Sequence, residues 1–343
     1  MNGARRSRCT AVRQTLLLAL LPLLLLLSAC GQGPAEEGGA VVFVLDSPVH
    51  EAFLEGRVLG LRSEDVTHGS LVARVLRSYC RAGLAPVPVE GADGTVARDA
   101  YLDGLRTVLE YMRREPARAV IVNISLSNPV ANPAEEELIR RLTEAGTLVV
   151  AAAGNNDTDE PFYPAAYPDV IAVASATRRG KALHSNYGTH VDIAASGDIS
   201  FIDYEFLPYE RLQREMEARG TSFAAPRVAG TVAFLVNRSS MTPREAYEVI
   251  AGTARPIADR HYRNGWLGAG LLDVLRARSR VSPGYRFAHF ILPMAVLALL
   301  AVASGYLCAR HGLPGVFLSV LAWVIALPGA LMAALQLGRW LEF

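Results

Sequence analysis

The sequence predicts an α/β fold with a doubly wound parallel sheet, because short apolar runs alternate with longer amphipathic segments through the middle of the chain. The runs are continuous rather than alternating in polarity, so we expect strands that are buried on both faces. They are AVVFVLD, AVIVNIS, TLVVAAA, VIAVAS and HVDIAA, at residues 40–46, 119–125, 147–153, 170–175 and 190–195. Ligands on such sheets bind at the carboxyl ends of the strands, where we therefore expect the functional residues.

Helices are expected between and after these strands, at residues 68–83, 100–115, 132–146 and 242–254. The third has clear boundary signals: Asn132 as the N-cap, Glu135 completing a capping box, and Gly146 as the stop. Thr242 and Glu245 repeat the capping box in the fourth. Residues 41–283 are long enough for one domain with a large core.

Both ends of the chain are more apolar than this domain. The 343 residues have a mean hydropathy of +0.23, high for a soluble protein. Residues 1–30 carry basic residues, then an apolar run that closes with Leu27-Ser28-Ala29-Cys30, the pattern of a secretory signal. Those last four residues resemble a bacterial lipobox, which would leave Cys30 as a diacylated N-terminus; the alternative is an uncleaved anchor. Residues 31–40 are a short flexible tether.

Two C-terminal segments are candidates for a transmembrane hairpin. Residues 287–308 and 313–337 carry no Asp, Glu, Lys or Arg. Each exceeds the roughly 20 residues that a helix needs to cross a bilayer. Residues 309–312 form only a tight turn between them, and Arg310 in that turn suits the cytoplasmic side. The domain would then lie on the periplasmic or extracytoplasmic side of a bacterial cytoplasmic membrane.

The net charge and the cysteine content bear on two further features, a nucleic-acid partner and a disulfide within the domain. The net charge of +1 argues against a nucleic-acid partner. Of the four cysteines only Cys80 falls within the domain, so an intradomain disulfide is excluded.

The segment GTSFAAPRVAG, residues 220–230, contains a serine that could be a catalytic group. Proline is tolerated in the first turn of a helix, so Pro226 is expected to mark a helix start, with Ser222 at or just before it. Unpaired N–H groups and the positive end of the helix dipole face outward there. Ser222 could merely cap the helix, or it could be a nucleophile that needs a base and a carboxylate from elsewhere in the chain.

Three other residues stand where such partners would be. Asp46 ends the first predicted strand, His68 opens a predicted helix, and Asn155 follows the strand TLVVAAA after a glycine. Each alone is commonplace, as a turn former or cap. Together, in this order and with GTSFAAP, they resemble the subtilisin-like serine peptidases. The resemblance covers about residues 41–274 and also includes VLDS, HGSLVA, VNISLS, AAAGNN, YPAAYPDVIAVAS and SNYGTHVDIAASG.

The resemblance implies a role for each residue. Ser222 would attack the scissile carbonyl, and His68 would take its proton and return it to the leaving amine. Asp46 would fix the tautomer of His68, while Asn155 and the backbone N–H of Ser222 would stabilise the oxyanion. The substrate backbone would pair with Ser125, Leu126 and Ser127. The pocket for the residue before the cut would be walled by Ala152, Ala153 and Gly154.

The sequence also departs from the family pattern. Ser47-Pro48 stands where Ser/Thr-Gly is usual, and Ser127 stands where glycine is common, which bears on specificity. Only the tether precedes the first strand, so we expect folding without an inhibitory pro-segment. The acidic loop at Asp157, Asp159 and Glu160 has no recognisable ligand spacing, and we interpret it as a solvated loop rather than a calcium site. No metal or cofactor is implied.

The function predicted from these features is a serine endopeptidase at the outer face of the cytoplasmic membrane. Two anchors suggest polypeptide substrates that are exported or lie near the membrane. Two alternatives stay open at this point: a dedicated maturation protease for a single exported partner, and a catalytically silent homologue that only binds peptides.

Overall fold

The computed structural model describes residues 39–54, 66–91, 94–206 and 211–281. The predicted signal, the acylation site Cys30, and the predicted spans at 287–308 and 313–337 lie outside the described residues. Within the described ranges, no helix is both long enough and apolar enough to cross a membrane.

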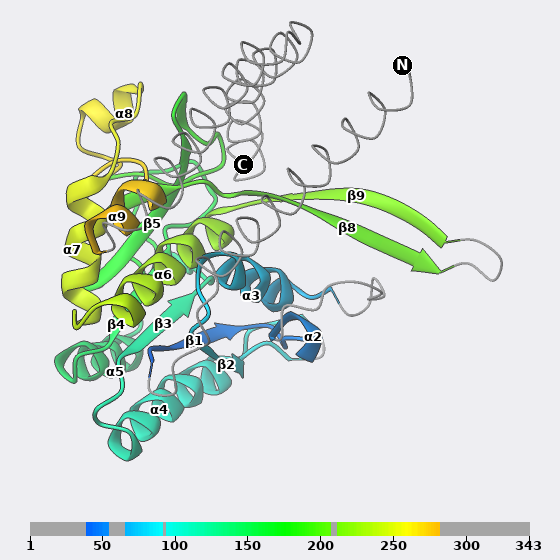
Figure 1. Ribbon diagram of the computed structural model, residues 1–343, viewed down its shortest axis with the longest axis vertical. Helices are drawn as coiled ribbons and strands as arrows, with labels where there is room; N and C mark the ends of the chain where they lie inside the picture. Colours follow the sequence, from blue (N-terminus) through cyan, green and yellow to red (C-terminus); the bar gives the residue numbers. More distant parts are fainter. Residues whose placement is uncertain (1–38, 55–65, 92–93, 207–210, 282–343) are drawn as a thin grey trace, which may run out of the picture. The chain divides into compact units, whose positions relative to one another are not determined.

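The predicted parallel sheet is confirmed (Figure 1). Five strands lie in the order β2-β1-β3-β4-β5, and β7 extends the parallel pairing from β5, while the short β6 pairs with β5 in the antiparallel direction. The residues of β1, β3 and β4 are all buried, as expected for strands covered on both faces. The strands are β1 (Val41–Asp46), β2 (Gly83–Pro88), β3 (Val120–Ile124), β4 (Leu148–Ala152), β5 (Val170–Thr177), β6 (Gly180–Lys181) and β7 (Ile193–Ala195).

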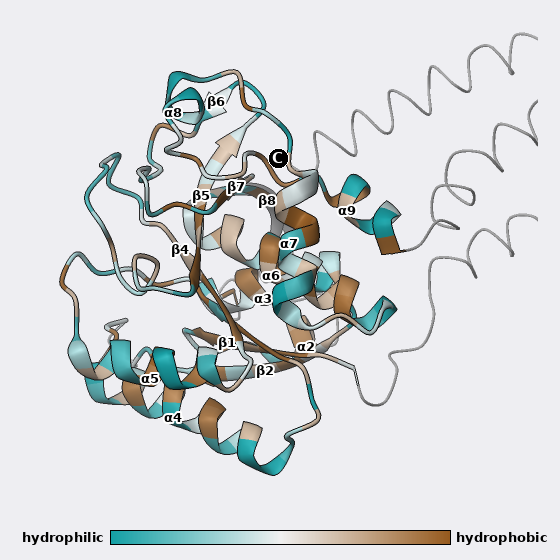
Figure 2. Cartoon of the chain, turned by 90° about the vertical axis from the view of Figure 1, so that its left-hand side faces the viewer, coloured by the Kyte–Doolittle hydropathy of each residue, from teal (hydrophilic) through white to brown (hydrophobic). Residues whose placement is uncertain are grey.

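Helices cover both faces of the sheet and enclose two apolar clusters. One face carries α4 (Arg98–Arg114) and α5 (Pro133–Glu144), and the other carries α3 (His68–Tyr79), α6 (Thr221–Arg238), α7 (Pro243–Thr253) and α9 (Val274–Val281). Figure 2 shows the apolar strands between these helices, whose outer faces are hydrophilic. Two short helices, α2 (Glu51–Leu54) and α8 (Arg260–Arg263), complete the described helices.

The helix predicted at residues 68–83 ends earlier, at Tyr79, and Gly83 instead begins β2, a strand that the sequence did not predict. The predicted helix caps are met except at Glu135. Asn132 caps α5 by accepting from the Ala134 N–H at 3.0 Å, and the capping box of Thr242 and Glu245 is present at α7. The capping box predicted for Glu135 is wrong. The Glu135 carboxylate is buried and instead accepts a hydrogen bond from the Tyr167 hydroxyl at 3.0 Å, a tertiary partner that lies beyond the reach of a local pattern.

Pro226 does not mark the start of its helix, which is a second correction. Helix α6 begins at Thr221, so Ser222 lies in its first turn and Pro226 lies inside the helix. A proline lacks the N–H that would bond the carbonyl four residues earlier, which is that of Ser222. That carbonyl accepts from the Ser125 hydroxyl at 2.8 Å instead, so a tertiary contact replaces the missing helical bond.

The sequence did not predict the antiparallel hairpin of β8 (Asp198–Phe206) and β9 (Arg211–Arg219). The hairpin extends away from the parallel sheet (Figure 1). Its sequence mixes polar and apolar residues and contains no continuous apolar run, so the pattern that revealed the other strands is missing. The chain leaves β7, runs out along β8, and returns along β9 directly to Gly220, where α6 begins.

Candidate active site

The sheet topology brings three of the predicted site residues to one edge. β1, β3 and β4 are neighbours, with Leu45 opposite Ile124 and Ile124 opposite Ala151. Asp46 is the last residue of β1, Ser125 directly follows β3, and Asn155 follows β4. Parallel strands end at the same edge of a sheet, so these residues lie in a row at the edge where ligands bind.

Asp46 and His68 form a fixed pair. The Asp46 Oδ1 atom lies 2.7 Å from the His68 Nδ1 atom, and the Asp46 side chain is fully buried. The same Oδ1 accepts from the Ser47 N–H at 2.8 Å, while the Ser47 hydroxyl accepts from the Gly69 N–H at 2.7 Å. A Cβ at Gly69 would lie only 2.3 Å from the Ser47 carbonyl oxygen, so glycine is needed for the helix to start this close to the strand end.

The surroundings of His68 act on its pKa in opposite directions. Burial lowers the pKa, whereas the hydrogen bond and the charge of Asp46, with a smaller contribution from the charge of Glu90, raise it. The net result is a pKa above the ordinary value of 6.5. The side chain is nevertheless 38% exposed, so the ring is open to a ligand.

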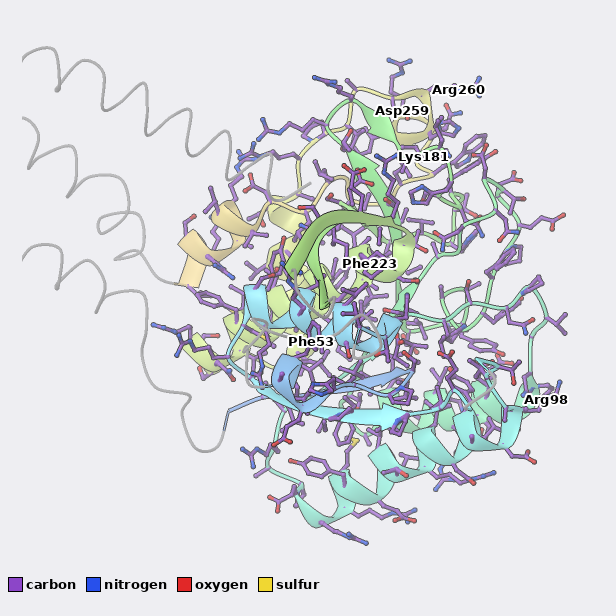
Figure 3. All side chains as sticks on the ribbon, turned by 90° about the vertical axis from the view of Figure 1, so that its right-hand side faces the viewer. Phe53, Arg98, Lys181, Phe223, Asp259 and Arg260 are labelled. Carbon is purple, nitrogen blue, oxygen red and sulfur yellow. The ribbon has the colours of Figure 1, made fainter. Side chains whose placement is uncertain are left out.

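Ser222 is bound reciprocally to Ser125. The Ser222 hydroxyl donates to the Ser125 carbonyl at 3.1 Å, and the Ser125 hydroxyl donates to the Ser222 carbonyl at 2.8 Å. Phe223, the next residue along α6, packs its ring 5.4 Å from the His68 ring, centroid to centroid, and is labelled near the start of that helix in Figure 3. The helix starts of α3 and α6 are therefore adjacent, but in this state the hydroxyl hydrogen bond of Ser222 goes to Ser125. Hydrogen bonds of catalytic residues commonly tighten only when substrate is bound.

Asn155 is held by Thr221, the residue directly before Ser222. The Asn155 Oδ1 atom accepts from the Thr221 N–H at 2.9 Å and from its hydroxyl at 3.0 Å. The same hydroxyl accepts from the Gly154 N–H at 3.2 Å. With Oδ1 engaged in this way, the Nδ2 donor of the exposed Asn155 amide is the group left to bind a ligand. A threonine next to the predicted nucleophile was the available signal for this clamp.

The other predicted binding residues differ in what they expose. Leu126 is half-buried and Ser127 exposed, whereas the side chains of Ala152 and Ala153 are buried in the core. Only their backbone could therefore line a substrate pocket. Gly154 has a φ of +107°, and a Cβ there would lie 2.3 Å from Asn186 Nδ2. The chain thus needs glycine to turn from β4 toward Asn155. Asn186, which sequence reasoning also missed, supports this turn by donating to the Ala153 carbonyl at 3.0 Å.

The acidic loop after Asn155 is paired with a lysine from another part of the chain. The Lys181 ammonium donates to Asp157 at 2.6 Å and also to the Ala182 and Ser185 carbonyls. Lys181 and Asp259 lie together in Figure 3, and the Lys181 N–H donates to Asp259 at 2.7 Å. Across the described residues, no group of three or more His, Cys, Asp or Glu side chains is arranged to hold a metal ion.

A buried carboxylate paired with a histidine, beside a serine at a helix N-terminus, suits acyl transfer through a nucleophilic hydroxyl. The model of one protein family, described as the subtilase family, matches residues 64–266, which is more than half of the chain. The chain belongs to the subtilase family. This subtilase is accordingly a serine endopeptidase, with polypeptides as its class of substrate.

Individual relatives agree with this assignment. The subtilase is similar to thermitase from Thermoactinomyces vulgaris, with 37% identity over 62% of this chain and 81% of the relative. It is 33% identical to an extracellular basic protease from Dichelobacter nodosus over 48% of this chain, but spans only 28% of that relative. Among solved structures, a protease from Pseudoalteromonas arctica has a TM-score of 0.55 at 22% identity, covering 72% of this chain and 91% of the other. That likeness shows the fold alone.

Proposed function

We propose that Asp46, His68 and Ser222 form the catalytic triad of this endopeptidase. The observation that carries the proposal is the 2.7 Å hydrogen bond between the buried Asp46 and His68, beside the start of the helix that bears Ser222. Asp46 holds the Nδ1–H tautomer of His68, which leaves Nε2 to accept the Ser222 proton. The hydroxyl oxygen then attacks the scissile carbonyl, and His68 returns the proton to the leaving amine.

We propose further that Asn155 Nδ2 and the Ser222 backbone N–H stabilise the oxyanion that forms in this attack. The clamp of Thr221 on Asn155 Oδ1 supports this role, because it aims the amide donor before substrate arrives. A donor held in place in advance needs no reorganisation when the negative charge develops. The Ser222 N–H lies in the first turn of α6, where the helix dipole also favours an anion.

For the substrate, we propose an extended peptide paired with the backbone of Ser125, Leu126 and Ser127 beyond β3. The Ser125 carbonyl is occupied by the Ser222 hydroxyl in the structure. Transfer of the Ser222 proton to His68 therefore requires this hydroxyl to rotate toward His68. Ala152, Ala153 and Gly154 would border the pocket for the residue before the cut through their backbone, because the alanine side chains are buried.

The triad is tested by labelling the full-length protein with a fluorophosphonate that reacts with activated serines. We expect labelling of the wild type and none of Ser222→Ala, with strong loss in His68→Ala. A matched control is Ser239→Ala, at the far end of α6, which should label like the wild type. If the wild type is folded, as judged by a circular dichroism spectrum typical of an α/β protein, and is still not labelled, this would contradict the proposal and favour the peptide-binding alternative.

We also propose that this endopeptidase is anchored at the outer face of a bacterial cytoplasmic membrane, through an acylated Cys30 and a hairpin of residues 287–308 and 313–337. The support is the sequence pattern alone, since these residues lie outside the described part of the chain. Substrates would then be exported or membrane-proximal polypeptides.

Anchoring is tested by fractionating cells that express the full chain. We expect the enzyme in the membrane fraction, resistant to alkaline carbonate, with the domain digested by external protease in spheroplasts. Cys30→Ser should remove a lipid-sized mass from the mature N-terminal peptide. Recovery of the enzyme in the soluble fraction, or a protected domain, would refute the anchoring while leaving the triad proposal intact.

A further inference from the structure

A second cavity, of about 220 Å³, is lined by none of the residues of the proposed active site. It is enclosed by α3, α6, α9 and the first residues of β8. Each of the three helices contributes one arginine: Arg74 from α3, Arg227 from α6 and Arg278 from α9. None of the described residues that line the cavity is acidic.

Two of the arginines are held in place by uncharged groups. Arg227, which is 5% exposed, donates to the Tyr79 hydroxyl and to the Asp198 backbone carbonyl, both at 2.7 Å. Arg278 donates to the Tyr79 carbonyl at 2.5 Å and lies 4.1 Å from the centre of the Phe234 ring. These contacts orient the two guanidinium groups.

Arg74 and Arg278 have N–H groups that donate no hydrogen bond within the described part of the chain. Within the described part of the chain, the Arg74 guanidinium has no hydrogen-bond acceptor, and burial lowers its pKa. The Arg278 Nε donor is buried and likewise has no acceptor among the described residues. The nearby Asp198 carboxylate pairs with Arg219. Placing cations together in a partly buried site is unfavourable unless an anion joins them.

We propose that this cavity binds a phosphate group between the guanidinium groups of Arg74, Arg227 and Arg278. The planar fork of arginine matches phosphate oxygens, and three forks from three helices suit a tetrahedral anion better than a flat carboxylate. The volume is below the roughly 300–1,000 Å³ of typical sites for whole small molecules, so it fits a small anion or a headgroup.

The phosphate could belong to a free ion or to a phospholipid, and the sequence favours the lipid. Arg278 lies in α9, shortly before the predicted span that begins at Phe287, and α9 also carries Arg276 and Arg280. Basic residues next to a span attract anionic lipid by roughly 1 kcal/mol each. This choice of source rests on the proposed membrane anchoring, whereas the phosphate site itself does not.

Two helices connect the cavity to the proposed active site, so a ligand in the cavity would affect how the site residues are held. Arg74 lies on α3, which begins at His68, and Arg227 lies on α6, whose first turn carries Ser222. Each arginine is five or six residues beyond its catalytic partner, or roughly 7–9 Å along the helix axis. A phosphate bound to both helices would therefore stabilise the packing of α3 against α6.

The test uses the full-length protein in a neutral detergent and follows its thermal unfolding. The two probes are inorganic phosphate and a six-carbon-chain phosphatidylglycerol, each compared with chloride at matched ionic strength. The variant is Arg74→Gln, because Arg74 makes no hydrogen bond within the described part of the chain that the change would break. The control is Arg106→Gln, an exposed arginine on α4 that pairs with Asp103.

For the wild type and Arg106→Gln we expect at least one probe to raise Tm above the chloride value, as ligand binding to the folded state requires. In Arg74→Gln we expect at least tenfold weaker binding of that probe, with an unchanged or higher Tm in its absence, because the change removes a half-buried charge that has no hydrogen-bond acceptor among the described residues. Arg74→Lys, which keeps the charge but loses the fork, should fall between the two.

Tighter binding of phosphatidylglycerol would identify a lipid headgroup as the source, and tighter binding of inorganic phosphate would identify the free ion. If neither probe raises Tm above chloride, or if Arg74→Gln responds like the wild type, the proposal is overturned. Fluorophosphonate labelling of the same samples separates this outcome from a failure of the triad, because labelling depends on Ser222 and not on the phosphate site.

Discussion

The two halves of the proposed triad are organised differently. Asp46 and His68 are joined at 2.7 Å, and Ser47 and Gly69 tie the strand end to the helix start behind them. On the other side, the Ser222 hydroxyl donates to Ser125, not to His68. The base half is therefore complete before substrate arrives, whereas the nucleophile half needs one hydroxyl rotation. The base half depends on buried backbone contacts, and the nucleophile half on a hydroxyl, which rotates at little cost.

The largest effect is expected from breaking the base half. In Asp46→Asn the amide cannot hold the charged imidazolium and favours the wrong tautomer of His68, so kcat should fall about 10⁴-fold. Steady-state hydrolysis of a chromogenic peptide measures this. Because the Asp46 charge raises the pKa of His68, the pKa of His68 should also fall, which NMR titration of the histidine would detect. A loss below tenfold would mean that Asp46 does not orient the base.

The oxyanion donor comes next. Asn155→Ala should lower kcat about 10²–10³-fold, the size seen for a subtilisin donor of this kind, with little change in KM. Thr221→Val tests the clamp, since it removes the hydroxyl that bonds Asn155 but keeps the shape of the side chain. We expect a smaller loss of kcat than in Asn155→Ala. An equal loss of kcat/KM through KM alone would indicate a substrate-binding role instead.

The reciprocal bonds of the nucleophile half are tested by Ser125→Ala. This change leaves the Ser222 carbonyl without its hydroxyl partner, and Pro226 cannot supply the helical N–H in its place. An unsatisfied carbonyl of this kind lowers the free energy of unfolding by about 1–3 kcal/mol, which chemical denaturation would measure. Ser127→Ala, an exposed neighbour, is the control and should be neutral.

The smallest effect is expected from Glu90→Gln. The Glu90 charge is the weakest of the influences that raise the pKa of His68, so removing it lowers that pKa. His68 must be neutral to act as the base, and the acid limb of kcat/KM against pH should therefore move to lower pH with an unchanged plateau. A shift to higher pH would contradict this sign.

The same pKa has a consequence for stability. A histidine whose pKa is raised by folding stabilises the folded state most at pH values below its unfolded pKa of about 6.5. That contribution is lost as the pH rises through the folded-state pKa. Comparing His68→Gln with the wild type in denaturation curves on both sides of this range would measure it.

Local signals in the sequence were enough to predict every strand of the parallel sheet except β2, and most helix caps, whereas the four residues of the proposed site were assigned through the resemblance to a family. Buried strands have apolar runs, helix caps have short motifs, and the carboxyl ends of parallel strands meet at one edge, so Asp46 and Asn155 could be placed from the pattern alone. The errors at Glu135 and Pro226 arose where a distant side chain took over a local hydrogen bond.

Only the tertiary structure decided how these residues contact one another. The bonds between Ser125 and Ser222 join positions 97 residues apart, and the clamp of Thr221 on Asn155 spans 66. Such contacts depend on strand register and on how closely helices pack, neither of which a local pattern records. The three arginines of the second cavity follow the same rule, because Arg74, Arg227 and Arg278 converge only when α3, α6 and α9 pack on one face of the sheet.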